Sequence, residues 1–281
     1  MTQEEFIAKI PLAKKAEIIA VHESGLIAIN KGAGLAAHPN PVKRSKTQSS
    51  DKAPSSSKPQ PPCAIRAPYN FDREYFSWTD ENGTKLRLHL VNRLDSPTSG
   101  VMILSTNKET ADAARLAFKG KSVKKTYYAI CIGKPHIAKG VWNDLIKKDT
   151  LENYVRASAA NSGDLATTEY LVEKSDANSV GFYLLKLEPI TGKTHQLRIQ
   201  CAQRKFPILG DATYGDFRMN KRVKELAEVI RLFLHCAYTK LEFELNGKKM
   251  SFEANAPMPN SFSTIMDYNA KLYSVSRGFA K

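Results

Sequence analysis

The chain has few of the residues that build disulfide frameworks or metal centres. Only four of its 281 residues are cysteine, and no two of them form a Cys-x-x-Cys pair. No histidine stands at ligand spacing from them, so we expect neither disulfides nor a metal site. Three of the four stand among apolar residues and are predicted to be small buried side chains: Cys131, Cys201 and Cys236.

Long apolar runs are also missing. No run approaches the roughly 18 residues that cross a bilayer. Met1 to Lys9 carries acidic residues where a signal peptide would carry a basic head and an apolar core. The sequence therefore predicts a soluble, cytoplasmic protein without a membrane partner, and we expect a monomer.

Acidic residues are outnumbered by basic ones. The 28 Asp and Glu face 42 Lys and Arg, which gives a formal net charge of +14. Such an excess favours a polyanionic partner, with nucleic acid ahead of an anionic membrane surface. A hydrophobic content of 42% excludes a wholly disordered chain.

One segment differs in composition from the rest. Between Pro41 and Pro68, proline and serine fill 12 of 28 positions, and six basic residues face one acidic residue, a net charge of +5. The segment is too poor in apolar residues to fold alone, so we predict a flexible basic insert over 41–68. The ordered body is expected to begin near residue 16, with 1–16 as an N-terminal extension and 17–281 as one domain around the insert.

Strand-like and helix-like patterns alternate irregularly, which indicates an α+β class. Thr106 with Glu109 predicts a capping box that starts a helix. The five aromatic residues from Tyr69 to Trp78 favour core packing over base stacking. The other predicted elements are strands over Glu17 to Ala20, Leu26 to Asn30, Val101 to Leu104, Thr126 to Gly133, Ala166 to Glu173, Val180 to Glu188, Thr239 to Leu245 and Met250 to Ala254, and helices over Asn220 to Phe233 and Ser261 to Leu272.

The densest polar cluster is Asn92-Arg93-Leu94-Asp95-Ser96-Pro97-Thr98-Ser99-Gly100, which leads into an apolar strand. If this segment is extended, Arg93 and Asp95 point to one side while Leu94 points into the core. The alternative is a turn in which Asp95 accepts hydrogen bonds from the amides that follow it.

A second polar cluster is Thr191-Gly192-Lys193-Thr194-His195-Gln196-Leu197-Arg198. Apolar residues recur after it at helical spacing, which would place His195 and Arg198 one turn apart, although the pattern also permits a strand. A buried Arg198 would need an acidic partner, so a structural salt bridge is the alternative to a functional role. The glycine that a nucleotide-triphosphate loop needs upstream of Gly-Lys is missing, which excludes such a site.

These two clusters, with Lys125-Thr126-Tyr127 between them and Pro207-Ile208-Leu209-Gly210-Asp211 and Tyr214-Gly215 after them, resemble the three ordered motifs of RluA-type RNA pseudouridine synthases. The resemblance covers roughly residues 17–255 and implies a mixed, mainly antiparallel sheet core with flanking helices. The chain departs from the family at Gly32, Asn92 and Lys193, where Pro, His and Arg are common. The family's N-terminal S4-like RNA-binding domain does not fit before residue 17.

The resemblance also implies a function, the isomerisation of specific uridines in structured RNA (rRNA or tRNA) without a cofactor. Asp95 is implied as the catalytic carboxylate and Arg198 as its ion-pair partner. Tyr127 is implied as the ring against the target uracil and as a candidate for helping to remove the C5 proton. Arg93, which can fill the stack left by a flipped base or hold a phosphate, is an expected RNA contact together with Lys125, Lys193 and His195. Lys31, His38 and His195 lie in matching motifs but are left out of the expected catalytic set, because a lone histidine is more often a structural residue.

Two other functions compete with this one. The first is an RNA-binding protein of the same fold without the reaction. The second is a glycoside hydrolase, in which Asp95 with Asp211 or Asp216 would supply two carboxylates.

Overall fold

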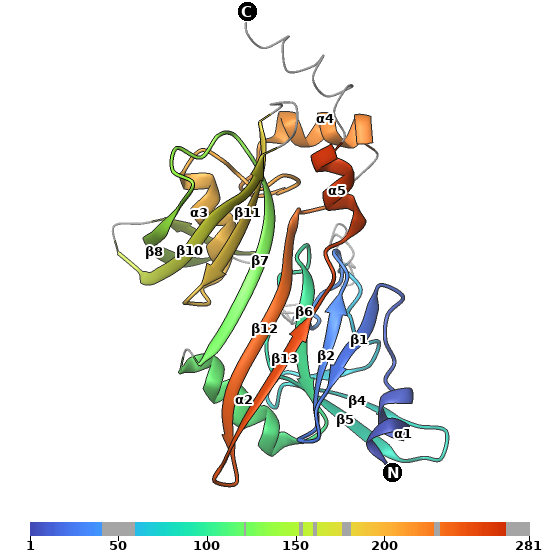
Figure 1. The fold of residues 1–281 in the computed structure, drawn as a ribbon. Helices are drawn as coiled ribbons and strands as arrows, with labels where there is room; N and C mark the ends of the chain where they lie inside the picture. Colours follow the sequence, from blue (N-terminus) through green and yellow to red (C-terminus); the bar gives the residue numbers. More distant parts are fainter. Residues whose placement is uncertain are drawn as a thin grey trace, which may run out of the picture.

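One continuous sheet with helices against it carries the fold of the computed structural model (Figure 1). The structure describes residues 1–40, 60–120, 122–151, 154–159, 162–175, 181–227 and 231–267. Within these residues the sheet has 13 strands. Every strand pair is antiparallel except β6 with β12. The predicted α+β class with a mixed, mainly antiparallel sheet is confirmed.

The strands cross the sheet in the order β3-β4-β5-β6-β12-β7-β11-β10-β8-β9, while β2 with β1 joins β6, and β13 joins β12. The strands are β1 Ala16–Val21, β2 Leu26–Lys31, β3 Tyr69–Asn70, β4 Tyr75–Thr79, β5 Lys85–Leu90, β6 Ser99–Ser105, β7 Val123–Ile132, β8 Lys139–Leu151, β9 Tyr154–Ala159, β10 Asp164–Ser175, β11 Phe182–Pro189, β12 Leu234–Leu245 and β13 Lys248–Asn255. The helices are α1 Gln3–Ala8, α2 Lys108–Lys119, α3 Gln196–Gln203, α4 Phe217–Ala227 and α5 Asn260–Asp267.

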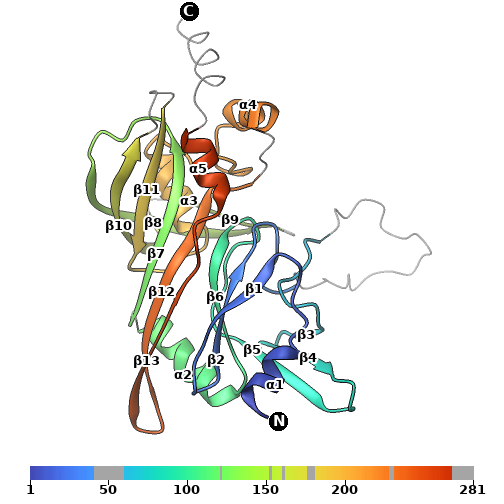
Figure 2. The same ribbon diagram turned by 45° about the vertical axis from the view of Figure 1, so that its right-hand side comes forward.

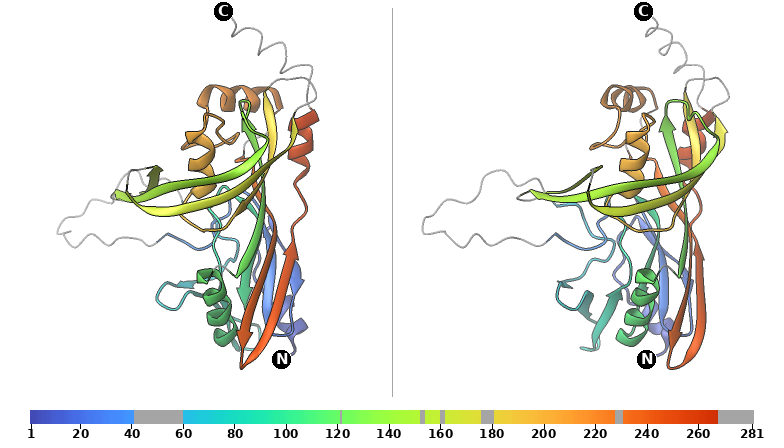
Figure 3. Two further views of the ribbon diagram at one scale, coloured as in Figure 1. Left: turned by 60° about the vertical axis from the view of Figure 1, so that its left-hand side comes forward. Right: turned by 90° about the vertical axis from the view of Figure 1, so that its left-hand side faces the viewer.

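Two hydrophobic clusters meet around the central strand β12. One packs β1, β2, β5 and β6 with α1 and α2, and the other packs β7 and β11 with α3 and α5. Figure 3 shows α3 beside the long β8 and β10 strands, which extend sideways from the body. The three cysteines predicted to be buried are buried and free. The two halves of the molecule therefore join where β6, β12 and β7 lie side by side.

The first residues pack onto the body, so the expectation that the ordered body begins near residue 16 is wrong. Thr2 and Glu5 form a reciprocal capping box that starts α1. Phe6 is buried, and its ring lies edge-on to Trp78 of β4 with 5.8 Å between the ring centroids. Figure 2 shows α1 near the ends of β1 and β4.

Part of the predicted insert also belongs to the body. Ala64 and Ile65 are fully buried, and the Ala64 amide donates to the Ala36 carbonyl at 2.9 Å. The prediction of a flexible segment is therefore wrong for 60–68. The rest of the insert, 41–59, lies outside the described residues.

Helix α2 is capped by a different residue from the one predicted. The side chain of Asn107 accepts the Thr110 amide at 2.8 Å and marks the N-cap. The predicted capping box of Thr106 with Glu109 is therefore wrong, although the helix itself is present. Ala111 is fully buried on its inner face.

The second half contains the predicted strands and two more. β7, β10, β11, β12 and β13 match the predicted strands, except that Val180 lies outside the described residues. The patterns did not predict β8 and β9. Helix α4 begins at Phe217 and ends at Ala227, not at Phe233, which leads into β12. Residues 228–230 and 268–272 lie outside the described residues.

The aromatic run near β4 divides between core and surface. Phe76 is fully buried, as core packing predicts, whereas Phe71 is 44% exposed. Core packing is therefore the wrong interpretation for Phe71.

Candidate active site

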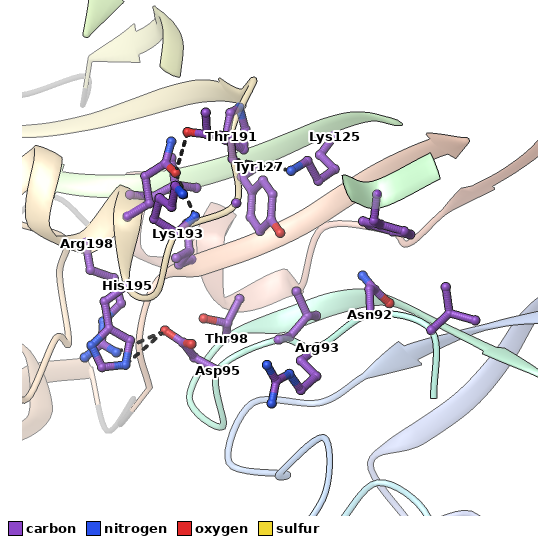
Figure 4. A pocket seen from close by; sticks show the side chains of 18 residues that line it. Asn92, Arg93, Asp95, Thr98, Lys125, Tyr127, Thr191, Lys193, His195 and Arg198 are labelled. Atoms are coloured by element: carbon purple, nitrogen blue, oxygen red, sulfur yellow. Dashed lines mark hydrogen bonds and ion pairs between the residues drawn. The ribbon is translucent and has the colours of Figure 1, made fainter. Parts of the chain in front are cut away.

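A cavity of about 290 Å³ opens where the loop before β6, strand β7 and the start of α3 meet. Arg93 and Asp95 stand on one wall, and Lys125 and Tyr127 stand on the wall opposite (Figure 4). All seven predicted site residues line this cavity: Arg93, Asp95, Lys125, Tyr127, Lys193, His195 and Arg198. A second, wider cavity of about 530 Å³ shares Arg93, Lys125 and Lys193 with it.

The loop before β6 presents Asp95 to the cavity. Leu94 is buried while Arg93 is exposed, and the Asp95 side chain is 30% exposed. The Thr98 amide donates to the Asp95 backbone carbonyl at 3.0 Å, so a turn is present. The turn uses the backbone of Asp95, which leaves its carboxylate available for the cavity.

Arg198 joins Asp95 to a second carboxylate from the segment after α3. Its Nη1 donates to Asp95 Oδ2 at 3.1 Å, while Nε and Nη2 donate to Asp211 Oδ2 and Oδ1 at 2.7 and 2.8 Å. Burial alone would lower the pKa of Arg198, but the hydrogen bonds and charges of Asp211 and Asp95 raise it. The guanidinium therefore stays charged and has a fixed orientation.

Asp211 is the second acidic partner of Arg198, which the sequence patterns did not predict. Its side chain is 1% exposed and also accepts the amides of Thr213 and Tyr214. Burial would raise the pKa of Asp211, but the Arg198 hydrogen bond holds it below its ordinary value. The signal that could have found it was the need of a buried Arg198 for an acid.

This geometry excludes the glycoside hydrolase interpretation. A buried Asp211 whose oxygens are occupied by Arg198 and two amides is not free to act as an acid or base. Asp216 accepts the Met219 amide at the start of α4 and does not line the cavity. Asp95 therefore has no second carboxylate partner among these candidates.

His195 caps α3 in a left-handed backbone conformation, with φ of 55°. Its helix confirms that His195 and Arg198 lie one turn apart, so the strand alternative is wrong. Nε2 lies 3.7 Å from Asp95 Oδ2, and Nδ1 is 2.9 Å from the Tyr214 hydroxyl. Burial lowers the pKa of the imidazole, although the nearby Asp95 charge acts the other way.

Tyr127 and Lys125 lie two residues apart on β7 and therefore face the same side. Burial, with the Cys236 thiol and the Asp95 charge, raises the pKa of the Tyr127 phenol well above its ordinary value. Burial lowers the pKa of Lys125, whose Nζ lies 3.5 Å from the Thr191 carbonyl oxygen. Because its pKa is raised, the Tyr127 phenol is neutral at physiological pH.

Lys31 supports the loop that carries Asp95. It is fully buried, and its Nζ donates to the carbonyls of Gly32, Leu35 and Ser96 at 3.2, 2.7 and 3.2 Å. Burial lowers its pKa to about 7, against the opposing effect of Asp95. The contacts of Lys31 therefore join the segment after β2 to the loop that carries Asp95.

Among the described residues, no set of three or more His, Cys, Asp or Glu side chains is placed to hold a metal ion. Within the same part of the chain, no helix is long and apolar enough to cross a membrane.

Comparison with known proteins identifies the family. A family model described as RNA pseudouridylate synthase matches residues 25–203, more than half of the chain. The chain belongs to the RNA pseudouridylate synthase family. This membership makes it an isomerase that acts on RNA.

Relatives of this pseudouridine synthase span most of its length. The ribosomal large subunit pseudouridine synthase C of Rickettsia bellii (strain RML369-C) is 32% identical over 253 residues, 89% of this chain and 72% of that protein. The tRNA pseudouridine synthase C of Yersinia pestis is 28% identical over 204 residues, 65% of this chain and 79% of that protein.

Two human structures share the fold. Human RNA pseudouridylate synthase domain containing 1 has a TM-score of 0.59 at 18% identity and covers 94% of this chain and 95% of that chain. Human RNA pseudouridylate synthase domain containing 4 has a TM-score of 0.54 at 23% identity and covers 94% of each.

The three residues that differ from the family pattern each form a hydrogen bond or an ion pair in the structure. The Gly32 amide donates to the Lys15 carbonyl at 2.7 Å, a bond that proline cannot make. Asn92 Oδ1 accepts the Ile103 amide at 2.7 Å. Lys193, which lines the cavity, pairs with Asp164 of β10 at 2.9 Å. The partners of Gly32, Asn92 and Lys193 are therefore residues other than Asp95, Tyr127 and Arg198.

Proposed function

We propose that this enzyme converts specific uridines of structured rRNA or tRNA to pseudouridine, with Asp95 as the catalytic carboxylate. The observation that carries the proposal is the Asp95 carboxylate, held by Arg198 at 3.1 Å on one side and 30% exposed to the cavity on the other. The names of the relatives support the RNA class, since one acts on the ribosomal large subunit and another on tRNA.

The reaction breaks the bond from N1 to C1′, turns the base and joins C5 to C1′. The C5 proton then leaves, while N1 gains a proton, so atoms and charge balance without a redox or phosphoryl group. Asp95 serves this chemistry in one of two ways: it adds to C1′ as the N1 bond breaks and leaves again when C5 attacks, or it takes a sugar proton and returns it when C5 and C1′ join. Arg198, oriented by Asp211, keeps the carboxylate at the cavity and balances its charge.

Tyr127 is proposed to lie against the target uracil. Its neutral phenol suits a ring contact with the base better than service as a strong base, because the pKa of the hydroxyl is raised. The stacked base must leave its helix to reach this ring, at a cost of a few kcal/mol.

The basic side chains at the rim are proposed to hold the RNA backbone. Arg93 is exposed beside Asp95, and Lys125 and Lys193 line both cavities. Burial lowers the pKa of His195, so its contribution is a neutral hydrogen bond and not a charge. That the enzyme is a cytoplasmic monomer stays a prediction.

The test is release of tritium from RNA labelled at uridine C5, with no metal or nucleotide added. Asp95→Asn keeps the size of the side chain and should abolish release while RNA binding, measured by filter retention, stays within a few fold. Undiminished turnover by the Asn variant would remove Asp95 from the mechanism. Binding without turnover by the unmodified protein would instead support the inactive RNA-binding alternative. Comparing pseudouridines in rRNA and tRNA from cells with and without the gene would identify the substrate.

A further inference from the structure

Three aromatic rings form a cluster beside the active site that the chemistry above does not use. The ring of His38 stacks on Tyr69, with centroids 5.2 Å apart and 13° between the planes. Phe71 lies edge-on to both, 6.1 Å from His38 and 5.2 Å from Tyr69. These residues, called the aromatic cluster below, come from the segment after β2 and from the start of the β3–β4 hairpin.

The cluster is anchored to the core and open to solvent at one ring. Tyr69 pairs with Phe76 across β3 and β4, and their rings lie 4.8 Å apart. Phe76 is fully buried, whereas Phe71 is 44% exposed. An exposed ring on a rigid support loses little conformational freedom when it binds a ligand.

The turn itself does not require an aromatic residue. Phe71 begins the connection from β3 to β4, where Asn70 Oδ1 accepts the Arg73 amide at 2.9 Å. Positions of this kind favour Gly, Asn, Asp or Ser for backbone reasons. Neither turn geometry nor burial accounts for Phe71.

Hydrogen bonds connect the cluster to the catalytic cavity. His38 Nδ1 donates to the Pro39 carbonyl at 2.7 Å, which leaves Nε2 to accept from Arg93 Nη1 at 3.3 Å. Arg93 lines the cavity two residues before Asp95. A chain of contacts therefore leads from Phe71 through Tyr69 and His38 to Arg93 at the cavity.

We propose that the aromatic cluster binds a nucleobase that flanks the target uridine. This flanking base stacks on Phe71, while Arg93 holds a neighbouring phosphate. The inference rests on the proposed function, because it takes RNA as the occupant. RNA fits the surface since every base has a face that stacks on an aromatic ring and each nucleotide brings an anionic phosphate. When the target base leaves its helix, its neighbours lose a stacking partner, and an aromatic ring can replace it.

The test uses a 13-nucleotide RNA with one central uridine among adenosines and a 5′ fluorescein for binding. Parallel RNAs without fluorescein carry 2-aminopurine, whose fluorescence falls on stacking, at each of the three positions on either side of the uridine. The variants are Phe71→Ala, Phe71→Leu and Phe71→Trp. Phe217→Ala is the matched control, because Phe217 is 63% exposed at the start of α4 and lines neither cavity.

We expect quenching at one flanking position with the unmodified enzyme, and its loss in Phe71→Ala with binding weakened by about 5-fold or more. Phe71→Leu, which keeps apolar bulk without a ring face, should behave like the Ala variant, whereas Phe71→Trp should keep both signals. Equal quenching and affinity in Phe71→Ala and Phe217→Ala would overturn the proposal, as would normal quenching in Phe71→Leu. The same experiment distinguishes failure of the proposed reaction from failure of the base site. If quenching depends on Phe71 but the protein makes no pseudouridine, the proposed reaction is refuted and the base-binding site is still supported.

Discussion

Arg198 contacts two carboxylates with different parts of one guanidinium. Its Nε and Nη2 donate to the two carboxylate oxygens of Asp211, and its Nη1 donates to Asp95. A lysine at this position would offer a point charge without the fixed fork, so the orientation of Asp95 depends on the residue being arginine.

Replacement of Tyr127 by Phe separates the two roles of the tyrosine. The ring is kept, so RNA binding should stay within about 2-fold, while the rate of tritium release should fall if the hydroxyl assists proton removal. Single-turnover rates at saturating RNA are the measurement. A rate equal to that of the unmodified enzyme would restrict Tyr127 to stacking, and a failure to bind RNA would contradict both roles.

Lys31 should make stability depend on pH in the basic range. Its pKa in the folded protein is about 7, below the ordinary 10.5, so between these values the unfolded chain binds more protons. The free energy of unfolding contributed by Lys31 therefore rises with pH in this window and falls as pH drops toward 7. Urea unfolding from pH 7 to pH 10 measures the free energy of unfolding of the unmodified protein and of Lys31→Met. The value for the unmodified protein minus that for Lys31→Met should rise with pH. A constant difference would mean that the Lys31 ammonium keeps its proton.

The seven residues predicted from the motifs line one cavity, but the motifs did not predict how their side chains pair. Asp95, Tyr127 and Arg198 stand in motifs whose order carries information about function. The bond from Arg198 to Asp211 depends on how α3 packs against the turn after it, which local patterns do not encode. The exposure of Phe71 was not predicted for a similar reason, because a run of aromatic residues does not indicate which ring points toward solvent.

At the scale of elements, two capping-box patterns in the sequence differ in outcome. The pair Thr2 and Glu5 is a capping-box pattern that the structure uses to start α1. The same pattern at Thr106 and Glu109 was not used, because Asn107 caps the helix one residue later. Strands β8 and β9 escaped prediction because much of β8 is polar and charged, so its hydrophobic alternation is weak.

Helix α1 should contribute to stability without contributing to catalysis. Phe6 is 7% exposed against Trp78, and Lys9 forms an ion pair with Asp80 at 2.7 Å. Phe6→Ala should lower the free energy of unfolding by about 3 kcal/mol, because a large buried ring is removed. The exposed Glu4→Ala on the same helix should cost less than about 1 kcal/mol. Urea unfolding measures both, and a fall in the saturated catalytic rate of Phe6→Ala would show that α1 also shapes the site.

At the scale of the whole molecule, net charge should govern RNA affinity. Residues 41–59 carry five basic residues and one acidic residue, a net charge of +4, out of +14 for the chain. A variant with these basic residues changed to Gln and the acidic residue changed to Asn keeps the length and the proline and serine positions. We expect a higher KM at moderate salt and a flatter plot of log affinity against log salt, by roughly 0.7 to 0.9 for each phosphate that the variant no longer neutralises.

The chemical step should be unaffected by that variant. Uniform attraction acts on the ground state and the transition state alike, so the single-turnover rate at saturating RNA should stay within a few fold. An unchanged salt slope would show that 41–59 is a passive spacer. A collapse of the saturated rate would show that it helps to build the active site.

The order in which the strands are made differs from the order in which they pair. β12 lies between β6 and β7, yet it is synthesised after both, and residues 133–233 separate it from β7. Until β12 leaves the ribosome, β6 and β7 each keep one side without the partner that the finished sheet provides. Open strand sides of this kind promote pairing with other chains. The residues that carry Asp95 and Arg198 are thus both synthesised before β12, the strand that joins β6 to β7 in the finished sheet.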